Sequence, residues 1–253
     1  MTQVQSLSRT FSLLDLLAAS DLGLSLTDLS TRAGLAPSTV HRLLNSLKHV
    51  GYVECEESTG LWSVGVQCFS VGNAFLKKRD YVARARPHMK ELVKRTGETA
   101  NLAILSEGQV LYVVQIESKE VMRTAVQIGS RGTLYATGVG KSMLSTLTQE
   151  GVSALLKGVK LKAFTPNTCT TRASLFAALE QARLQGCALD DEEQSAGLRC
   201  VAANIYDHFG EAIAAVSISG PSVRVTKQRI AKLSAEVILA ANKITADIGG
   251  VHP

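Results

Sequence analysis

Apolar residues near the start of the chain recur at helical spacing and predict three short helices. Residues 7–19 place four apolar side chains on one face: Leu7, Phe11, Leu14 and Leu17. Ser25 and Asp28 have the spacing of a capping box, which predicts a second helix that runs to about residue 33. Gly34 supplies a tight turn, and Pro37 opens the third helix, because its missing N–H costs nothing in the first turn.

Two runs of strand-like sequence follow the third helix and predict a β-hairpin. The runs GYVECE and LWSVGV are joined by the polar link EESTG, which contains a glycine. Three helices followed by a hairpin form the winged helix-turn-helix arrangement, in which the third helix enters the major groove of DNA.

The rest of the chain predicts a mixed α+β domain. From Glu98 the period changes from helical to strand-like, and ANLAILSEGQVLYVVQIE reads as two strands around a Glu-Gly turn. Strands joined by short turns pair antiparallel, so we expect a mostly antiparallel sheet. The other predicted elements are helices at 68–80 and 81–95, a strand at 121–128, a glycine-rich turn ATGVGK leading into a helix at 141–147, a helix at 173–186, strands at 198–207 and 212–219, and a helix at 226–248.

This pattern predicts three parts in an α+β chain. Residues 1–67 are the winged helix-turn-helix domain, residues 68–80 a linker helix, and residues 81–253 an effector-binding and oligomerisation domain. No internal repeat or low-complexity segment interrupts them.

The polar face of the third helix carries no acidic residue. Between Asp28 and Glu54 the chain has no acid. The first 80 residues as a whole hold equal numbers of basic and acidic residues, so the net charge of +5 comes from the rest of the chain. A helix that reads base edges needs hydrogen-bonding groups without repelling carboxylates. An ordinary amphipathic helix whose solvent face lacks acids is the alternative. The candidates for DNA contacts are Thr27, Ser38, Thr39, His41, Arg42, Asn45 and Ser46.

Cysteine usage and the N-terminal sequence predict a cytoplasmic protein. The five cysteines are an odd number, widely spaced, without the Cys-x-x-Cys or Cys/His spacing of a zinc site. The N-terminus lacks the basic and apolar regions of a signal peptide, and the apolar runs are far shorter than the ~20 residues of a membrane span. We therefore expect reduced thiols, no metal, no cofactor and no membrane partner.

Four short features are candidates for a small-molecule site. In EAIAAVSISGP, strand alternation puts Ser217 and Ser219 on one face. Their two hydroxyls could bind two oxygens of one small carboxylate, or they could cap or solvate a sheet edge. The segment ATGVGK could cradle an anion or form a plain turn, but it lacks the full phosphate-loop pattern, so we reject nucleotide binding. We interpret Cys200 as a thiol that lines a pocket or lies in the core. The four acids at 190–193 are typical of a solvated face, although one of them could point into a site.

Three blocks of sequence resemble the IclR family of bacterial transcription regulators. They are SLSRTFSLLDLLA with LTDLSTRAGLAPSTVHRLLNSLKHVGYVE and GLWSVGV, then TGETANLAIL with IGSRGTLYATGVGKSML, then LDDEEQSAGLRCVAANIYDHFGEAIAAVSISGPSVRVT. Within the family, the chain looks most similar to the glyoxylate-responsive repressors, which include the regulator of allantoin utilisation. The resemblance implies a GAF-like effector domain whose ligand contacts are Thr137, Gly138, Val139, Asp190, Cys200, Ser217, Ile218 and Ser219.

The resemblance also implies a mechanism. It suggests a repressor that binds an operator in double-stranded DNA as a homodimer, assembles to a tetramer, and responds to a small carboxylate such as glyoxylate or pyruvate. Relatives tend to have alanine at the position of Val139, whose extra methyl groups would favour a small ligand. An activator of a small-acid catabolic pathway is the alternative. An enzyme or thiol sensor built on Cys200 is the rival class, but the sequence offers it no paired base and no metal ligands.

Overall fold

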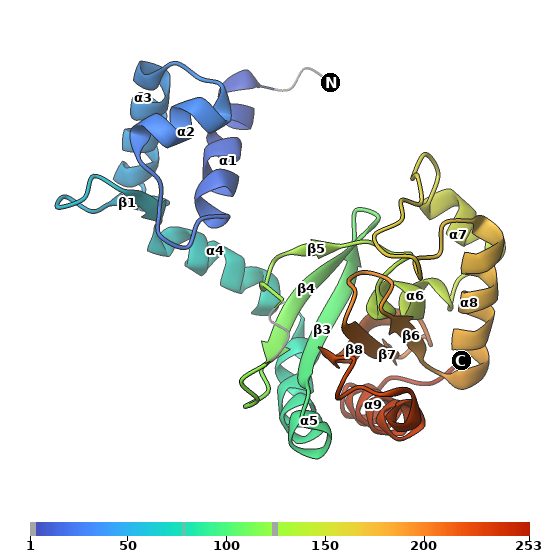
Figure 1. Ribbon diagram of the computed structural model, residues 1–253. Coiled ribbons are helices and arrows are strands. Elements are labelled where there is room, and N and C mark those ends of the chain that lie inside the picture. The colour runs from blue at the N-terminus through green and yellow to red at the C-terminus, as the bar shows by residue number, and fades with distance from the viewer. Residues whose placement is uncertain (1–3, 78, 123–125) are drawn as a thin grey trace. The chain divides into compact units, whose positions relative to one another are not determined.

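The protein folds into two compact units, which divide between Arg79 and Asp80 (Figure 1). The structure is a computed structural model that describes residues 4–77, 79–122 and 126–253. Each unit has its own hydrophobic core, one formed by the N-terminal helices and hairpin, the other between a sheet and its helices.

The three predicted N-terminal helices are present. They are α1 (Gln5–Ala18), α2 (Leu26–Ala33) and α3 (Pro37–His49). Ser25 caps α2 by accepting the N–H of Asp28, and its hydroxyl donates to the Asp28 carboxylate, which lowers the pKa of Asp28. The turn between α2 and α3 requires Gly34, because its φ of 64° disfavours residues with a side chain. Apolar residues of all three helices form one buried cluster that includes Leu13, Leu17, Leu29, Val40 and Leu44.

The predicted hairpin forms the wing beside these helices. Strands β1 (Val53–Cys55) and β2 (Trp62–Val64) pair antiparallel. Leu24, before α2, exchanges two backbone hydrogen bonds of 2.9 Å with Trp62, so the wing is fixed to the helical core. The winged helix-turn-helix prediction is therefore confirmed. Helix α4 (Val66–Lys77) follows the wing, and Asp80 already begins α5 (Asp80–Thr96).

The second unit is a three-layer α+β domain around one antiparallel sheet. The strand order is β5-β4-β3-β8-β7-β6. Helices α5 and α9 (Lys227–Asp247) cover one face, while α6 (Gly138–Leu144) and α8 (Arg172–Gln185) contact the other side (Figure 1). The strands are β3 (Thr99–Ser106), β4 (Gln109–Ile116), β5 (Arg131–Gly132), β6 (Ala188–Asp191), β7 (Leu198–Tyr206) and β8 (Ala212–Pro221).

Five details of this unit differ from the sequence prediction. The described residues of 121–128 are not a strand, and residues 123–125 of it lie outside the described part of the chain. Val121 and Met122 are exposed, so the apparent strand pattern of this segment buries no apolar face. The glycine-rich segment is itself the first turn of α6, which begins at Gly138 instead of residue 141. The prediction also missed strands β5 and β6 and the short helix α7 (Gln149–Leu155).

No helix in the described residues is both long and apolar enough to cross a membrane.

Candidate functional site

The α3 surface carries most of the predicted DNA-contacting residues. Apolar Val40, Leu44 and Leu47 face the core, so the opposite side of the helix is turned outward. The exposed residues on α3 include Ser38, His41, Arg42, Asn45, Ser46, Lys48 and His49, and none is acidic. Thr39 is half-buried, and Thr27 is exposed on α2.

Two local contacts order part of that face. The Asn45 side-chain amide lies 3.2 Å from His41 Nε2, and the Ser46 hydroxyl donates to the Arg42 carbonyl. The Arg42 guanidinium makes no ion pair with another described residue, so its donors remain available for a phosphate or guanine. Thr27 lies on α2, where its backbone carbonyl accepts a hydrogen bond from the Thr31 hydroxyl one turn later. The face is thus suited to DNA, with Arg42 as its main cationic group.

In the second unit, strand register aligns a row of polar side chains across the sheet. Asp190 on β6 pairs with Cys200 on β7, Cys200 pairs with Ser219 on β8, and Ser219 pairs with Thr99 on β3. Paired residues project to the same face of an antiparallel sheet. Ser217 lies two residues from Ser219 on that face, opposite Ala202 and Asn101. We call Asp190, Cys200, Ser217 and Ser219 the polar cluster.

The polar cluster contains a buried hydroxyl without a partner. Ser217 is fully buried, and its Oγ forms no hydrogen bond of ordinary geometry with a described residue, although it lies close enough to the Cys200 thiol to lower the pKa of that thiol. Ser219 Oγ accepts a long bond of 3.4 Å from the Asn101 amide, whose oxygen accepts from Gln115. Leaving a buried polar group unpaired costs roughly 1–3 kcal/mol. Such a group calls for an explanation, which a bound water, an ion or a ligand could each supply.

Asp190 is held in place by the backbone that follows it. Its Oδ1 accepts the N–H groups of Glu193 at 2.7 Å and Gln194 at 3.3 Å. Burial raises the pKa of Asp190 to about 7, and the N–H donors together with Lys141 limit that increase. The carboxyl group can therefore change its charge near neutral pH.

A buried ion pair lies beside the polar cluster. Lys141 on α6 is 2% exposed, and its ammonium contacts the Glu193 carboxylate and the Leu189 carbonyl. The other carboxylate oxygen of Glu193 is buried and has no hydrogen-bond partner within the described part of the chain. Lys141 therefore ties α6 to the strand that carries Asp190.

The Cys200 thiol is not activated for chemistry. Burial and the nearby Asp190 carboxyl raise its pKa to about 11, so the thiol stays protonated at neutral pH. Burial likewise raises the pKa of Tyr112, which stands near Cys200 and Asp190. Among the described residues there is also no group of three or more His, Cys, Asp or Glu side chains that could hold a metal ion. The cluster consists of hydrogen-bonding groups without an activated nucleophile.

The start of α6 passes over Cys200. A side chain at Gly138 would place its Cβ 3.0 Å from Cys200 Sγ, so this glycine allows the close approach. Gly140 is equally constrained, since a Cβ there would lie 2.4 Å from the Leu134 carbonyl oxygen. Thr137 caps the helix by accepting the N–H of Gly140. Val139 points its side chain into the apolar cluster, which leaves its backbone as the part that could meet a ligand.

The structure separates Ile218 from the other predicted effector residues. It alternates with Ser217 and Ser219 and therefore faces the layer of α5 and α9.

The interpretation of residues 190–193 as a solvated face is wrong for two of the four acids. Asp190 and Glu193 are 3% and 7% exposed, whereas Asp191 and Glu192 pair with Arg199.

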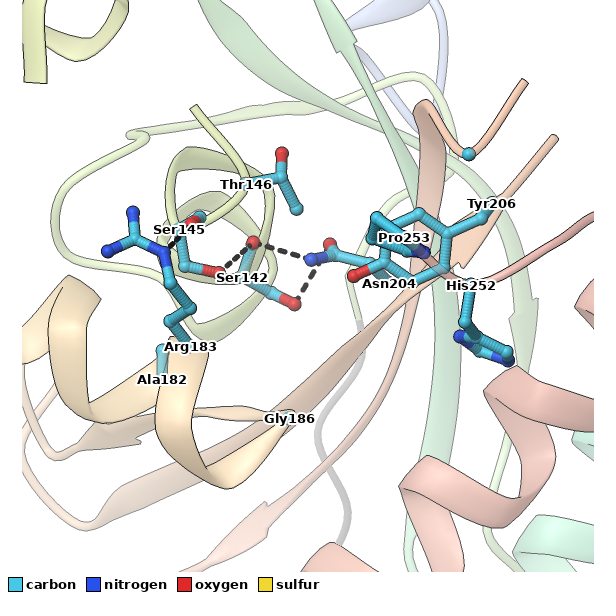
Figure 2. Close-up of a pocket in the computed structure, with 11 residues that line it drawn as sticks. Ser142, Ser145, Thr146, Ala182, Arg183, Gly186, Asn204, Tyr206, His252 and Pro253 are labelled. Atoms are coloured by element: carbon cyan, nitrogen blue, oxygen red, sulfur yellow. Dashed lines mark hydrogen bonds between the residues drawn. The ribbon is translucent and has the colours of Figure 1, made fainter. Parts of the chain in front are cut away.

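A separate hollow of about 380 Å³ lies at the other end of β7 (Figure 2). It is bordered by Ser142, Asn204, Arg183 and His252. Ser142 and Asn204 bind each other through two hydrogen bonds, and Arg183 donates to the Ser145 carbonyl. Ser142, Asn204 and Arg183 thus have hydrogen-bond partners within the protein.

Sequence reasoning missed Lys141, Glu193, Tyr112 and Asn101 as neighbours of the polar cluster. Lys141 appeared only as the end of an incomplete phosphate-loop pattern. Asn101 and Tyr112 carry a weak signal, since each is a polar group within an apolar strand. Only the strand pairing shows that these distant residues share one face.

Comparison with known proteins covers both units. Residues 6–57 match the IclR helix-turn-helix domain, and residues 73–246 match the bacterial transcriptional regulator IclR C-terminal domain. The chain is 42% identical over 252 residues to the acetate operon repressor of Salmonella typhimurium, with 99% of this chain and 92% of that protein covered. It is 36% identical over 250 residues to the repressor AllR of Escherichia coli, with 98% and 92% covered. The crystal structure of the Thermotoga maritima IclR matches with a TM-score of 0.83 at 28% identity, covering 98% of this chain and 100% of that one.

Proposed function

Because the chain belongs to the IclR family of bacterial transcriptional regulators, we propose that it is a repressor controlled by a small carboxylate of the glyoxylate and pyruvate class. The family resemblance predicted from the sequence is confirmed, and the chain is a DNA-binding regulator and not an enzyme. Repression is supported by the names of the acetate operon repressor and AllR, which outweigh the activator alternative.

The observation that carries the effector proposal is the unpartnered Ser217 hydroxyl. It lies beside Cys200, Ser219 and Asp190, all of which offer hydrogen bonds on the same face of the sheet. A ligand with two or three oxygens would satisfy these groups at once. A small carboxylate with a carbonyl or hydrated aldehyde fits that requirement.

Dimerisation would present two α3 helices to the two halves of an operator. The exposed apolar residues Leu7 and Phe11 on α1 support this assembly, as do Val66 and Phe69 on α4. Large exposed apolar patches mark interaction sites. The second unit would associate into a tetramer, and the protein would act in the cytoplasm, where its DNA lies.

The effector controls repression only if it binds the DNA-competent and DNA-incompetent states with different affinity. A typical coupling of ~1–3 kcal/mol changes operator affinity by roughly 5–150-fold. We propose that the effector favours the state that releases the operator.

A thermal-shift screen against small 2-oxo and hydroxy acids tests the effector class. A ligand at 100 times its dissociation constant stabilises the folded protein by about 2.7 kcal/mol. Glyoxylate or pyruvate should therefore raise the melting temperature clearly, while allantoin and glycolate serve as comparison ligands. The stabilising ligand should then release a labelled operator fragment. No shift with either acid would contradict the effector assignment and leave DNA binding untouched.

A second test concerns the role of Cys200. The Cys200→Ser variant keeps a hydrogen-bonding group, and the raised pKa of the thiol argues against covalent chemistry. We therefore expect a working repressor with effector affinity within about tenfold of wild type, a change of ~1.4 kcal/mol. Titration of operator release with glyoxylate measures this. Complete loss of regulation by a folded variant would restore the thiol-sensor alternative.

A further inference from the structure

The polar cluster and the ion pair beside it carry an unbalanced set of charges. Asp190, Glu193 and Lys141 are all more than nine-tenths buried. Lys141 contacts Glu193, and no lysine or arginine among the described residues forms an ion pair with Asp190. Two buried carboxylates thus share a single buried cation. An anionic ligand would add a further negative charge to this water-poor site.

From this charge count we infer that the effector binds together with one proton, which is taken up by Asp190. The inference rests on the proposed function, since it requires that the ligand of the polar cluster is a carboxylate. A buried charge is costly unless it is paired, and a group in that position commonly neutralises instead. Glu193 is paired with Lys141, whereas Asp190 has no such partner among the described residues, so Asp190 is the acid that can be neutralised.

The geometry allows a protonated Asp190 to help hold the ligand. Both backbone N–H groups bind Oδ1, which leaves Oδ2 as the oxygen that would carry the proton. A neutral carboxyl group can then donate a hydrogen bond to a ligand oxygen instead of repelling it. In this state Asp190 and the Ser217 hydroxyl both present donors from one face of the sheet.

The groups around Asp190 agree with this assignment. Lys141 approaches from α6, Glu193 from the turn after β6, Cys200 from β7 and Tyr112 from β4. The pKa values of the thiol and the phenol are raised by burial, so both groups stay neutral near pH 7. Asp191, on the other side of the strand, pairs with Arg199 and Lys227. Of the acids here, Asp190 has a pKa of about 7, so it can gain a proton in the physiological range.

The sign of the pH dependence follows from linkage. Below its pKa the free protein already carries the proton, so effector affinity is constant. Above it, binding must take up a proton, and affinity falls tenfold for each pH unit. With the pKa of Asp190 near 7, effector affinity should be about tenfold weaker at pH 8 than at pH 6. The effector should accordingly release the operator most effectively at acidic pH.

Isothermal titration calorimetry of the full-length protein tests this directly. Sodium glyoxylate and sodium pyruvate are titrated at about pH 8 in HEPES and in Tris, two buffers with clearly different ionisation enthalpies. Proton uptake makes the observed heats differ between the buffers, and we expect nearly one proton per site. Asp190→Asn should bind with no proton uptake and no pH dependence, because the amide remains a donor. Asp191→Asn is the matched control and should keep the uptake.

The outcomes separate the two proposals. Equal heats in both buffers with normal binding would overturn the inference and leave the proposed function standing. Unchanged uptake in folded Asp190→Asn would also overturn it, since another group would then take the proton. Absence of binding at both pH 6 and pH 8 would overturn the effector assignment and this inference together.

Discussion

Replacing Arg42 with alanine should weaken operator binding at least tenfold and leave folding and effector binding unchanged. Arg42 lies on the exposed, acid-free face of α3, and it makes no ion pair with a described residue. An arginine contact with a guanine or phosphate is worth about 1–3 kcal/mol, and the dimer that we propose would lose two of them. The measurement is a fluorescence anisotropy titration of a labelled operator.

The salt dependence of this variant identifies the contact that is lost. If Arg42 binds phosphate, the slope of log affinity against log salt should fall by about one per contact, and affinity for all sequences should drop together. If it reads a base, specificity should relax at one operator position. The control is Arg131→Ala, which removes an equal charge from an exposed position in the second unit. Wild-type affinity in Arg42→Ala would remove this residue from the DNA surface.

The second large effect is expected from the paired change Ser217→Ala and Ser219→Ala. This variant should lose the effector response, with ligand affinity reduced by at least about 100-fold, because two hydrogen bonds to a charged ligand are each worth about 1.5–3 kcal/mol. Operator binding without ligand should remain at the wild-type level. Calorimetry with glyoxylate and an operator-release titration measure the two properties separately.

Stability gives this prediction an independent check. Because Ser217 Oγ has no hydrogen-bond partner among the described residues, Ser217→Ala alone should not lower the melting temperature of the unliganded protein. Ser106→Ala, at the far end of β3, is a matched control that should keep full effector affinity. A double variant with an undiminished response would show that the effector binds elsewhere.

The N-terminal unit was predictable in detail because its signals are local. A capping pair at Ser25 and Asp28, a glycine at 34 with positive φ, and a proline at 37 each act within a few residues. Such signals fix where helices start and stop, whatever the rest of the chain does. Helical spacing also placed the acid-free face of α3 outward.

The second unit was harder to predict where order depends on distant partners. Strand β6 has only four residues and two acids, so it lacks an apolar alternation, and it exists because it pairs with β7. Residues 121–128 show the opposite case. Their sequence pattern suggested a strand, but a strand there would have no apolar face to bury and so would not be stabilised. The first turn of α6 contains two glycines, which disfavour a helix, yet the close contacts with Leu134 and Cys200 require them.

The sequence alone determined the class of this protein: a winged helix that binds DNA, joined to an α+β domain of the IclR family. It also identified Asp190, Cys200, Ser217 and Ser219 as separate candidates through their resemblance to that family. Only the tertiary structure decided that these four side chains share one face, that Ile218 does not, and that Lys141 and Glu193 lie beside them. The reason is physical. Periodicity and caps are set by neighbours in the chain, whereas burial, pairing and charge balance depend on residues that only folding brings together.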